Sequence, residues 1–86
     1  MLINMNIREN IRELLAINLC VDISYCRENA DLFYDLCADS LSLLSFAIEL
    51  DDQFGLATAD DPMMFKFRTV GEILNKAEEL CQSESK

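Results

Sequence analysis

The chain has 86 residues, with 16 Asp or Glu against 7 Lys or Arg, and a formal net charge of −9 at pH 7. We expect one domain spanning residues 1–86, and we exclude nucleic acids and anionic membranes as partners because their phosphates require Lys and Arg for neutralisation. The chain has no histidine, which removes Ser-His-Asp and Cys-His catalysis and the commonest neutral metal ligand.

Apolar residues at helical spacing predict a first helix over residues 4–19, whose inner face comprises Ile7, Ile11, Leu14 and Leu15. Residues 20–38 then form a connection that is long for a compact domain, and such connections are often functional. We expect its apolar residues to fold back across the core. These anchors are Val21, Ile23, Leu32, Phe33 and Leu36.

A second helix is predicted over residues 40–54, and Gly55 supplies its stop. Its apolar residues fall into two stripes at the helical period. The expected core face comprises Leu43, Phe46, Ala47, Leu50 and Phe54. The second stripe comprises Leu41, Leu44 and Ile48, with Asp51 and Asp52 at its margins. Two interpretations remain open: the helix is buried on two sides, or the second stripe is exposed and docks into a groove with a basic rim.

Asp61 and Pro62 suit the cap and first position of a short third helix that ends near Phe67. The last helix is predicted to begin at Thr69, because Thr69 and Glu72 have the spacing of a capping box. The polar residues 82–86 are predicted to fray. Together these elements predict an all-α fold, a small four-helix bundle with three longer helices and one short helix.

Asp39, Ser40 and Leu41 lie where the long connection meets the second helix. Asp and Ser are common N-caps, so capping alone explains the triplet. A serine in this position also has its hydroxyl free at a helix N-terminus, which suits a residue that another enzyme modifies.

The four cysteines, Cys20, Cys26, Cys37 and Cys81, show no Cys-x-x-Cys pair and no zinc-ligand spacing, so we expect no metal site. The first residues lack a basic leader before a continuous apolar stretch, and no apolar run reaches the ~18 residues that span a membrane. We therefore expect a cytoplasmic protein with reduced thiols, without a signal peptide or a membrane span.

The order of these motifs resembles acyl carrier proteins, whose modified serine lies in a Leu-Gly-x-Asp-Ser-Leu pattern. The corresponding segment here is Leu36-Cys37-Ala38-Asp39-Ser40-Leu41. Residues 31–36 resemble the loop that leads to the family's serine, residues 51–55 (Asp-Asp-Gln-Phe-Gly) resemble the end of its second helix, and residues 69–73 (Thr-Val-Gly-Glu-Ile) resemble the start of its last helix. By these four motifs, in the right order and at the right spacing, the chain is identified as a member of that family.

The resemblance implies a carrier and not an enzyme. It implies that Ser40, flanked by Asp39 and Leu41, receives 4′-phosphopantetheine from coenzyme A through a Mg-dependent phosphopantetheinyl transferase. The arm then carries acyl groups as thioesters to enzymes of fatty-acid, specialised lipid or polyketide synthesis that have basic patches. We expect a monomer, and we assign partner binding to Leu41, Leu44, Ile48, Glu49, Asp51, Asp52, Met63 and Phe65.

The resemblance also implies that an acyl chain can shelter between the helices. The candidates for the lining are Leu43, Phe46, Ala47, Leu50, Met64, Phe67 and Ile73. In the unloaded protein the same residues are expected to form an ordinary packed core.

The chain departs from the family's pattern in three places. Cys37 replaces a common glycine, so we expect the loop to be less free to adopt a positive φ. Ser42 and Ser45 replace carboxylates of fatty-acid carriers, and Met63 and Phe65 occupy positions that are often acidic. These departures favour a specialised carrier with dedicated partners.

Two alternatives stay open. An aminoacyl or peptidyl carrier, including a D-alanyl carrier, would share Asp39-Ser40, although peptidyl carriers usually have Gly-Gly-His/Asp-Ser where this chain has Cys-Ala-Asp-Ser. An unmodified acidic helical interaction module would tolerate Ser40→Ala, whereas a carrier would not. The residues do not determine the cargo.

Overall fold

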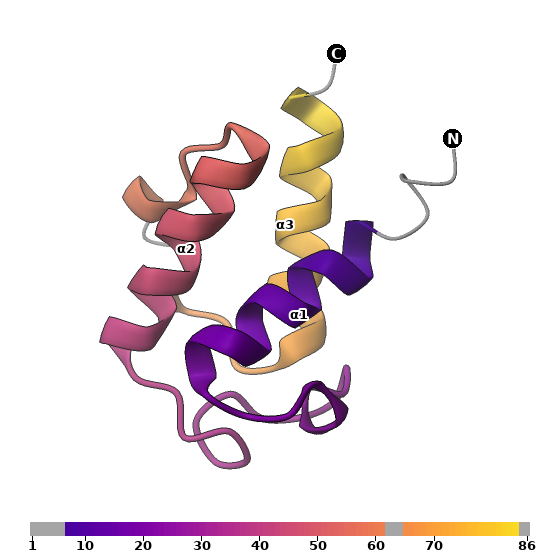
Figure 1. Ribbon diagram of the computed structural model, residues 1–86, viewed down its shortest axis with the longest axis vertical. Helices are drawn as coiled ribbons and strands as arrows, with labels where there is room; N and C mark the ends of the chain where they lie inside the picture. The colour runs from indigo at the N-terminus through magenta and orange to yellow at the C-terminus, as the bar shows by residue number, and fades with distance from the viewer. Residues whose placement is uncertain (1–6, 62–64, 85–86) are drawn as a thin grey trace.

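The computed structural model describes residues 7–61 and 65–84, the last three of these by their backbone alone. This part of the chain contains three α-helices, α1 (Ile7–Leu19), α2 (Ser40–Phe54) and α3 (Val70–Glu84). Two 3-10 helices, η2 (Ile23–Tyr25) and η3 (Thr58–Asp60), lie in the connections. Figure 1 shows α1 packed across α2 and α3, with the long connection looping past one end of the three helices. The predicted all-α fold is confirmed.

The core lies where the three helices meet, and each helix contributes one apolar face to it. Burial of a large apolar side chain contributes about 1.5–3 kcal/mol, so these faces hold the bundle together. The predicted core face of α2 is confirmed, with Phe54 at its partly buried edge. The central side chains, each 0% exposed, are Ile11, Leu15, Phe46, Leu50, Val70, Ile73 and Leu74.

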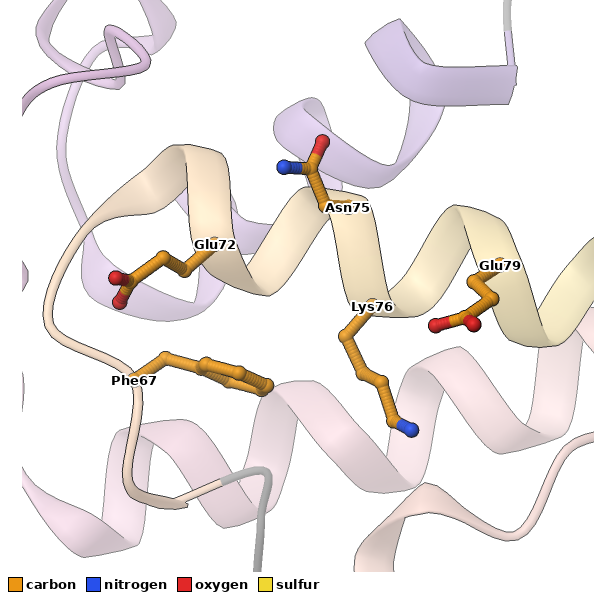
Figure 2. Close-up of a pocket in the computed structure, with 5 residues that line it drawn as sticks. All are labelled: Phe67, Glu72, Asn75, Lys76 and Glu79. Carbon is orange, nitrogen blue, oxygen red and sulfur yellow. The ribbon is translucent and has the colours of Figure 1, made fainter.

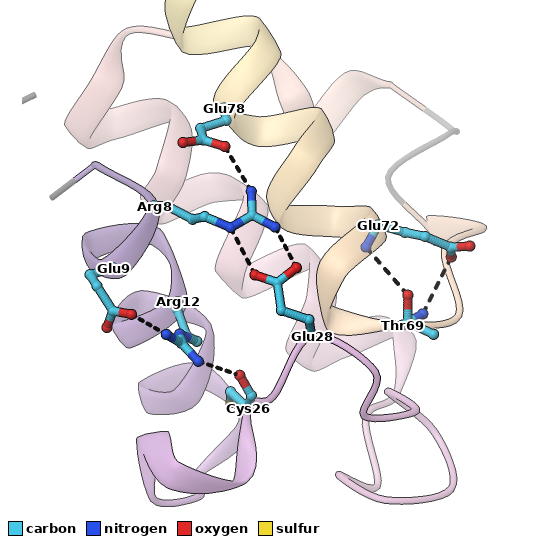
Figure 3. Close-up of polar contacts among 8 residues, drawn as sticks. All are labelled: Arg8, Glu9, Arg12, Cys26, Glu28, Thr69, Glu72 and Glu78. Atoms are coloured by element: carbon cyan, nitrogen blue, oxygen red, sulfur yellow. Dashed lines mark hydrogen bonds and ion pairs between the residues drawn. The ribbon is translucent and has the colours of Figure 1, made fainter. Parts of the chain in front are cut away.

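The ends of α2 and α3 follow from local sequence signals. Gly55 adopts φ 69 and donates its N–H to Asp51 O at 2.8 Å, which ends α2 as predicted. Thr69 and Glu72 form the predicted capping box (Figure 3): Glu72 N donates to Thr69 Oγ1, and Thr69 N donates to Glu72 Oε1, both at 3.3 Å.

One predicted boundary differs from the structure. The predicted start of the first helix, at residues 4–6, lies outside the described residues, within which α1 begins at Ile7. The predicted tail is wrong for residues 82–84, because α3 continues to Glu84 beyond the buried Cys81, which anchors its last turns to the core.

The short third helix predicted after Asp61 falls mainly on Pro62, Met63 and Met64, which lie outside the described residues. Phe65, which follows them, has a 3-10 conformation, and residues 66–68 are not helical. The described 3-10 helix that follows α2 is η3, which comes earlier in the chain than the predicted helix. Its position follows from the carboxylate of Asp51, which accepts hydrogen bonds from the backbone of η3.

Arg8 joins α1 to both the long connection and α3 (Figure 3). Its guanidinium donates to Glu28 Oε2 at 2.8 Å and to Glu28 Oε1 at 2.6 Å, and its third nitrogen donates to Glu78 Oε1 at 2.7 Å. The two-bond fork between the Arg8 guanidinium and the Glu28 carboxylate lowers the pKa of Glu28 and raises the pKa of Arg8. Such a two-bond pair has a defined geometry that a single surface contact lacks.

The end of the long connection is held against the start of α3 by main-chain hydrogen bonds. Leu32 N donates to Arg68 O at 2.7 Å, Val70 N to Ala30 O at 3.1 Å and Gly71 N to Glu28 O at 2.8 Å. A Cβ on Gly71 would lie 3.0 Å from Glu28 O, so glycine permits this close approach. These bonds fix the connection that leads to Ser40.

Candidate functional site

Ser40 is the first residue of α2 and its side chain is exposed. Within the described residues its hydroxyl has no hydrogen-bond partner. Asp39 precedes it as the N-cap, and Asp39 Oδ1 accepts from Ser42 N at 2.8 Å and from Ser42 Oγ at 2.7 Å. The bond from the Ser42 backbone, followed by that from its side chain, lowers the pKa of Asp39. The carboxylate thus caps the helix, and the serine beside it stays accessible.

Cys37, three residues before Ser40, corrects one prediction. The chain has φ 56 at Cys37, a left-handed conformation that the replacement of glycine was expected to disfavour. The turn is imposed from both sides, because Leu36 and Ala38 are buried and Ala38 N donates to Leu32 O at 2.8 Å. The cysteine therefore accepts a backbone conformation that suits glycine.

The turn at residues 31–35 is rigidly hydrogen-bonded. Asp31 Oδ1 accepts from Phe33 N at 2.9 Å and from Tyr34 N at 2.8 Å, while Asp31 N donates to Asp35 Oδ2 at 2.8 Å. The bond from the Tyr34 backbone is the main cause of the lowered pKa of Asp31. Arg68 Nη2 donates to Asp31 Oδ2 at 3.1 Å and ties the turn to the segment before α3.

This turn also corrects the predicted anchors of the long connection. Leu32 and Leu36 are buried as predicted, and Val21 and Ile23 are partly buried. Phe33 is instead 40% exposed, because the Asp31 turn directs it away from the core. Tyr34, to which the sequence analysis assigned no role, is 83% exposed.

The second apolar stripe of α2 is exposed. Leu41 is 74% exposed, Leu44 37% and Ile48 52%, so the interpretation in which α2 is buried on two sides is wrong. Leu41 and Leu44 line a shallow groove of about 290 Å³ together with Ser40 and Phe65. The groove thus joins the serine to one end of the stripe.

The carboxylates near this stripe have different surroundings. Glu49 and Asp52 are exposed, and Glu49 accepts a hydrogen bond from Asn18 Nδ2 at 3.3 Å. Asp51 faces η3, where its oxygens accept from Thr58 N at 2.6 Å, Thr58 Oγ1 at 2.5 Å and Ala59 N at 2.9 Å. Asp51 therefore has an internal structural role that the sequence analysis missed. Met63, the remaining partner-binding candidate, lies outside the described residues.

The candidates for an acyl lining are mostly closed within the core. Leu43 is 2% exposed, and Phe46, Ala47, Leu50 and Ile73 are 0% exposed. Phe67 instead borders a surface pocket of about 300 Å³ (Figure 2), whose other lining residues are Glu72, Asn75, Lys76 and Glu79. Met64 lies outside the described residues. The described interior has the form of the packed core that was expected for the unloaded protein.

All four cysteines are free thiols, with Cys26 and Cys81 buried and Cys20 and Cys37 exposed. Burial raises the pKa of both Cys26 and Cys81. In the part of the chain that the structure describes, every helix is too short or too polar to cross a membrane.

The surroundings of Ser40 fit a phosphate-linked group. An ester on Ser40 Oγ would place its negative charge at the N-terminus of a 15-residue helix, where the free N–H groups and the helix dipole favour anions. The carboxylate of the preceding residue, Asp39, already accepts two hydrogen bonds from Ser42. No rearrangement of the described residues is needed to free the hydroxyl.

Comparisons with known proteins agree with this geometry. Residues 7–76 match the family model described as a phosphopantetheine attachment site. The acyl carrier protein of Lactobacillus acidophilus is 38% identical over 65 residues, which cover 76% of this chain and 80% of the relative. That of Thermotoga maritima is 35% identical over 68 residues, covering 79% and 83%, and that of Chlamydia caviae is 29% identical over 70 residues, covering 81% and 90%. The chain therefore belongs to the acyl carrier protein family, whose cofactor is 4′-phosphopantetheine.

Proposed function

We propose that Ser40 is the attachment residue for 4′-phosphopantetheine, and that the protein delivers acyl groups on this arm to enzymes of fatty-acid or related lipid synthesis. The observation that carries the proposal is the exposed hydroxyl of Ser40, which is unpaired within the described residues, at the first position of α2. The four free thiols are consistent with a reducing compartment, and we place the carrier in the cytoplasm on that basis.

The residues around Ser40 have separate roles in a carrier. When bound, the arm supplies a thiol that holds the acyl group as a thioester. Asp39 fixes the start of α2 through Ser42, and the helix N-terminus would stabilise the charge of a phosphate attached to Ser40. The chain itself provides the scaffold on which partner enzymes act.

We assign partner binding to the exposed stripe of α2, formed by Leu41, Leu44 and Ile48, with Phe65 beside it. Glu49 and Asp52 supply charge next to the stripe, so a partner with an apolar groove and a basic rim is complementary to this face. The phosphopantetheinyl transferase and the acyl-processing enzymes are the partners that a carrier requires.

Intact mass tests the attachment residue. The protein is incubated with coenzyme A, Mg²⁺ and a broad-specificity phosphopantetheinyl transferase, in parallel with Ser40→Ala. We expect the wild type to gain one phosphopantetheine unit and Ser40→Ala to gain none. The matched control is Ser45→Ala, which alters another exposed serine of α2 and should gain the full unit. An unmodified, folded wild type would support the unmodified interaction module instead.

We further propose a specialised carrier. Ser42 and Ser45 leave the first turns of α2 without the carboxylates of typical fatty-acid carriers, and Ser42 donates its hydroxyl to Asp39. A kinetic comparison with a housekeeping carrier on standard fatty-acid elongation enzymes tests this point. We expect slower turnover of the present chain, and equal turnover would contradict the proposal.

A further inference from the structure

We propose that Phe33 and Tyr34 form a second contact surface, separate from the stripe of α2. The phosphopantetheinyl transferase covers this second surface when it modifies Ser40. This inference rests on the proposed role of Ser40.

The two rings are exposed in a way that the fold does not require. Tyr34 is 83% exposed and Phe33 is 40% exposed, and together with Arg68 they border a surface pocket of about 360 Å³. Aromatic residues and Arg are enriched in the buried centres of protein interfaces, where they account for much of the binding energy. An aromatic pair on the surface of an otherwise acidic chain therefore indicates a contact surface.

The turn presents these rings in a fixed arrangement. The backbone N–H groups of Phe33 and Tyr34 both bond to Asp31 Oδ1, and Leu32 N bonds to Arg68 O at 2.7 Å. A partner that binds a turn already ordered in this way loses little conformational entropy. The hydrogen bonds thus support binding as well as folding.

The position of the turn selects the partner. Leu32, next to Phe33, accepts the N–H of Ala38, two residues before Ser40, so the turn that carries the rings is tied directly to the segment that leads into the attachment point. An enzyme that acts on Ser40 Oγ must touch the surface around it, and a typical interface covers about 800 Å² on each partner. An enzyme that acts at the far end of the arm does not need to contact the surface around Ser40. We therefore assign the turn to the transferase.

The charges at the turn indicate the chemistry of the contact. Arg68 is paired with Asp31 at 3.1 Å, and both oxygens of Asp31 already accept hydrogen bonds. The two rings thus offer apolar surface beside the exposed, ion-paired Arg68, unlike the α2 face with Glu49 and Asp52. The transferase should present an apolar pocket here, and the contribution of the rings should not depend on salt.

The experiment measures the rate of phosphopantetheine transfer, as kcat/KM from intact mass, at low and high salt. The variants are Tyr34→Ser and the double variant Phe33→Ser with Tyr34→Ser. We expect the double variant to lose about tenfold in kcat/KM at both salt concentrations, as for the loss of an interface hot spot. The matched control is Tyr25→Ser in η2, where the ring is 62% exposed, and it should stay within about twofold of the wild type on the same scale.

Each other outcome has a defined meaning. If the wild type is modified and the double variant is modified equally fast, the second contact surface is refuted while the role of Ser40 stands. A loss that disappears at high salt, or an equal loss in Tyr25→Ser, also refutes it. If the wild type is not modified, the role of Ser40 itself fails. If Phe33→Ser lowers the melting temperature, the transfer rate of the single variant Tyr34→Ser decides whether the second contact surface exists. Tyr34→Phe keeps the ring and is expected to keep the wild-type rate.

Discussion

Ala38 donates its backbone N–H to the carbonyl oxygen of Leu32 at 2.8 Å, and this bond closes the turn that holds Cys37 at φ 56. The turn connects the buried Leu36 to Asp39, the N-cap of α2. The placement of Ser40 therefore depends on a residue in a left-handed conformation, which side chains with a Cβ adopt at a cost of about 1–2 kcal/mol.

Replacement of Cys37 by glycine should stabilise the protein. Glycine removes the left-handed strain but increases the entropy of the unfolded chain, which leaves a net gain of about 0.5–1 kcal/mol. Thermal unfolding should show a melting temperature higher by several degrees. The matched variant Cys37→Ala also removes the thiol but keeps a Cβ, so it should show no such gain. An equal gain in both variants would mean that the thiol, not the backbone, causes the effect.

Thr58 links η3 to α2, and its hydroxyl should account for part of the fold's stability. Thr58 is 1% exposed, and its Oγ1 donates to Asp51 and lies 3.2 Å from Ala47 O. Thr58→Val keeps the shape but removes the bond to a charged acceptor, so we expect a loss of about 1–2 kcal/mol in the free energy of unfolding. Thr58→Ser keeps the hydroxyl and should lose less, as measured by urea denaturation. A larger loss in Thr58→Ser would point to packing of the methyl group instead.

The features that could be predicted from the sequence depend on neighbours along the chain. The cap at Asp39, the stop at Gly55 and the capping box of Thr69 and Glu72 each involve residues three or four positions apart or a single special conformation. The exposed stripe of α2 could be separated from the core face by helical period, although only the structure decided between the two interpretations of it.

The features that could not be predicted depend on residues far apart in the sequence. The fork between Arg8 and Glu28 and the bond from Leu32 to Arg68 exist only after the chain has folded. The wrong expectation at Cys37 has the same origin. It weighed the local preference of cysteine, whereas the long connection, with Leu36 and Ala38 buried around Cys37, dictates the conformation.

Acid should destabilise the fold through specific carboxylates. The pKa values of Glu28, Asp31 and Asp39 are lowered in the folded state, chiefly by hydrogen bonds from Arg8, Tyr34 and Ser42 respectively. Between the folded and unfolded pKa values the unfolded chain binds more protons, so stability rises with pH in that range. Their stabilisation is thus complete above about pH 5, where the carboxylates are ionised even in the unfolded chain, and is lost as the pH falls through the lowered values.

Urea denaturation at pH 7, 5, 4 and 3 checks this prediction. We expect a marked decrease in the free energy of unfolding between pH 5 and pH 3. Glu28→Gln removes one of the lowered groups and should show a smaller decrease over the same interval. An identical decrease in this variant would mean that the Arg8 fork contributes nothing to the acid sensitivity.

Salt should stabilise the protein at neutral pH. The net charge of −9 creates self-repulsion, and the screening length falls from about 30 Å at 0.01 M salt to about 8 Å at 0.15 M. We expect the melting temperature to rise over this range, although the exposed Arg8–Glu28 pair is weakened by the same screening. A melting temperature that stays flat over this range would contradict the prediction that self-repulsion destabilises the fold at low salt.

The exposed stripe of α2 should matter for partner binding and little for folding. Leu44→Ser and Ile48→Ser change side chains that are 37% and 52% exposed, so each should alter the free energy of unfolding by about 0.5 kcal/mol or less. The transfer of an acyl group to the carrier that bears phosphopantetheine should slow about tenfold in the double variant Leu44→Ser with Ile48→Ser, because an apolar anchor of the interface is lost. The matched control is Ile17→Ser, on α1, where the side chain is 64% exposed. If Ile17→Ser slows acyl transfer as much as the double variant, the stripe is not the docking surface. If Ile17→Ser leaves the transfer rate unchanged, loss of an exposed apolar side chain does not by itself slow transfer. The slower transfer in the double variant then identifies the α2 stripe as the surface that partners contact.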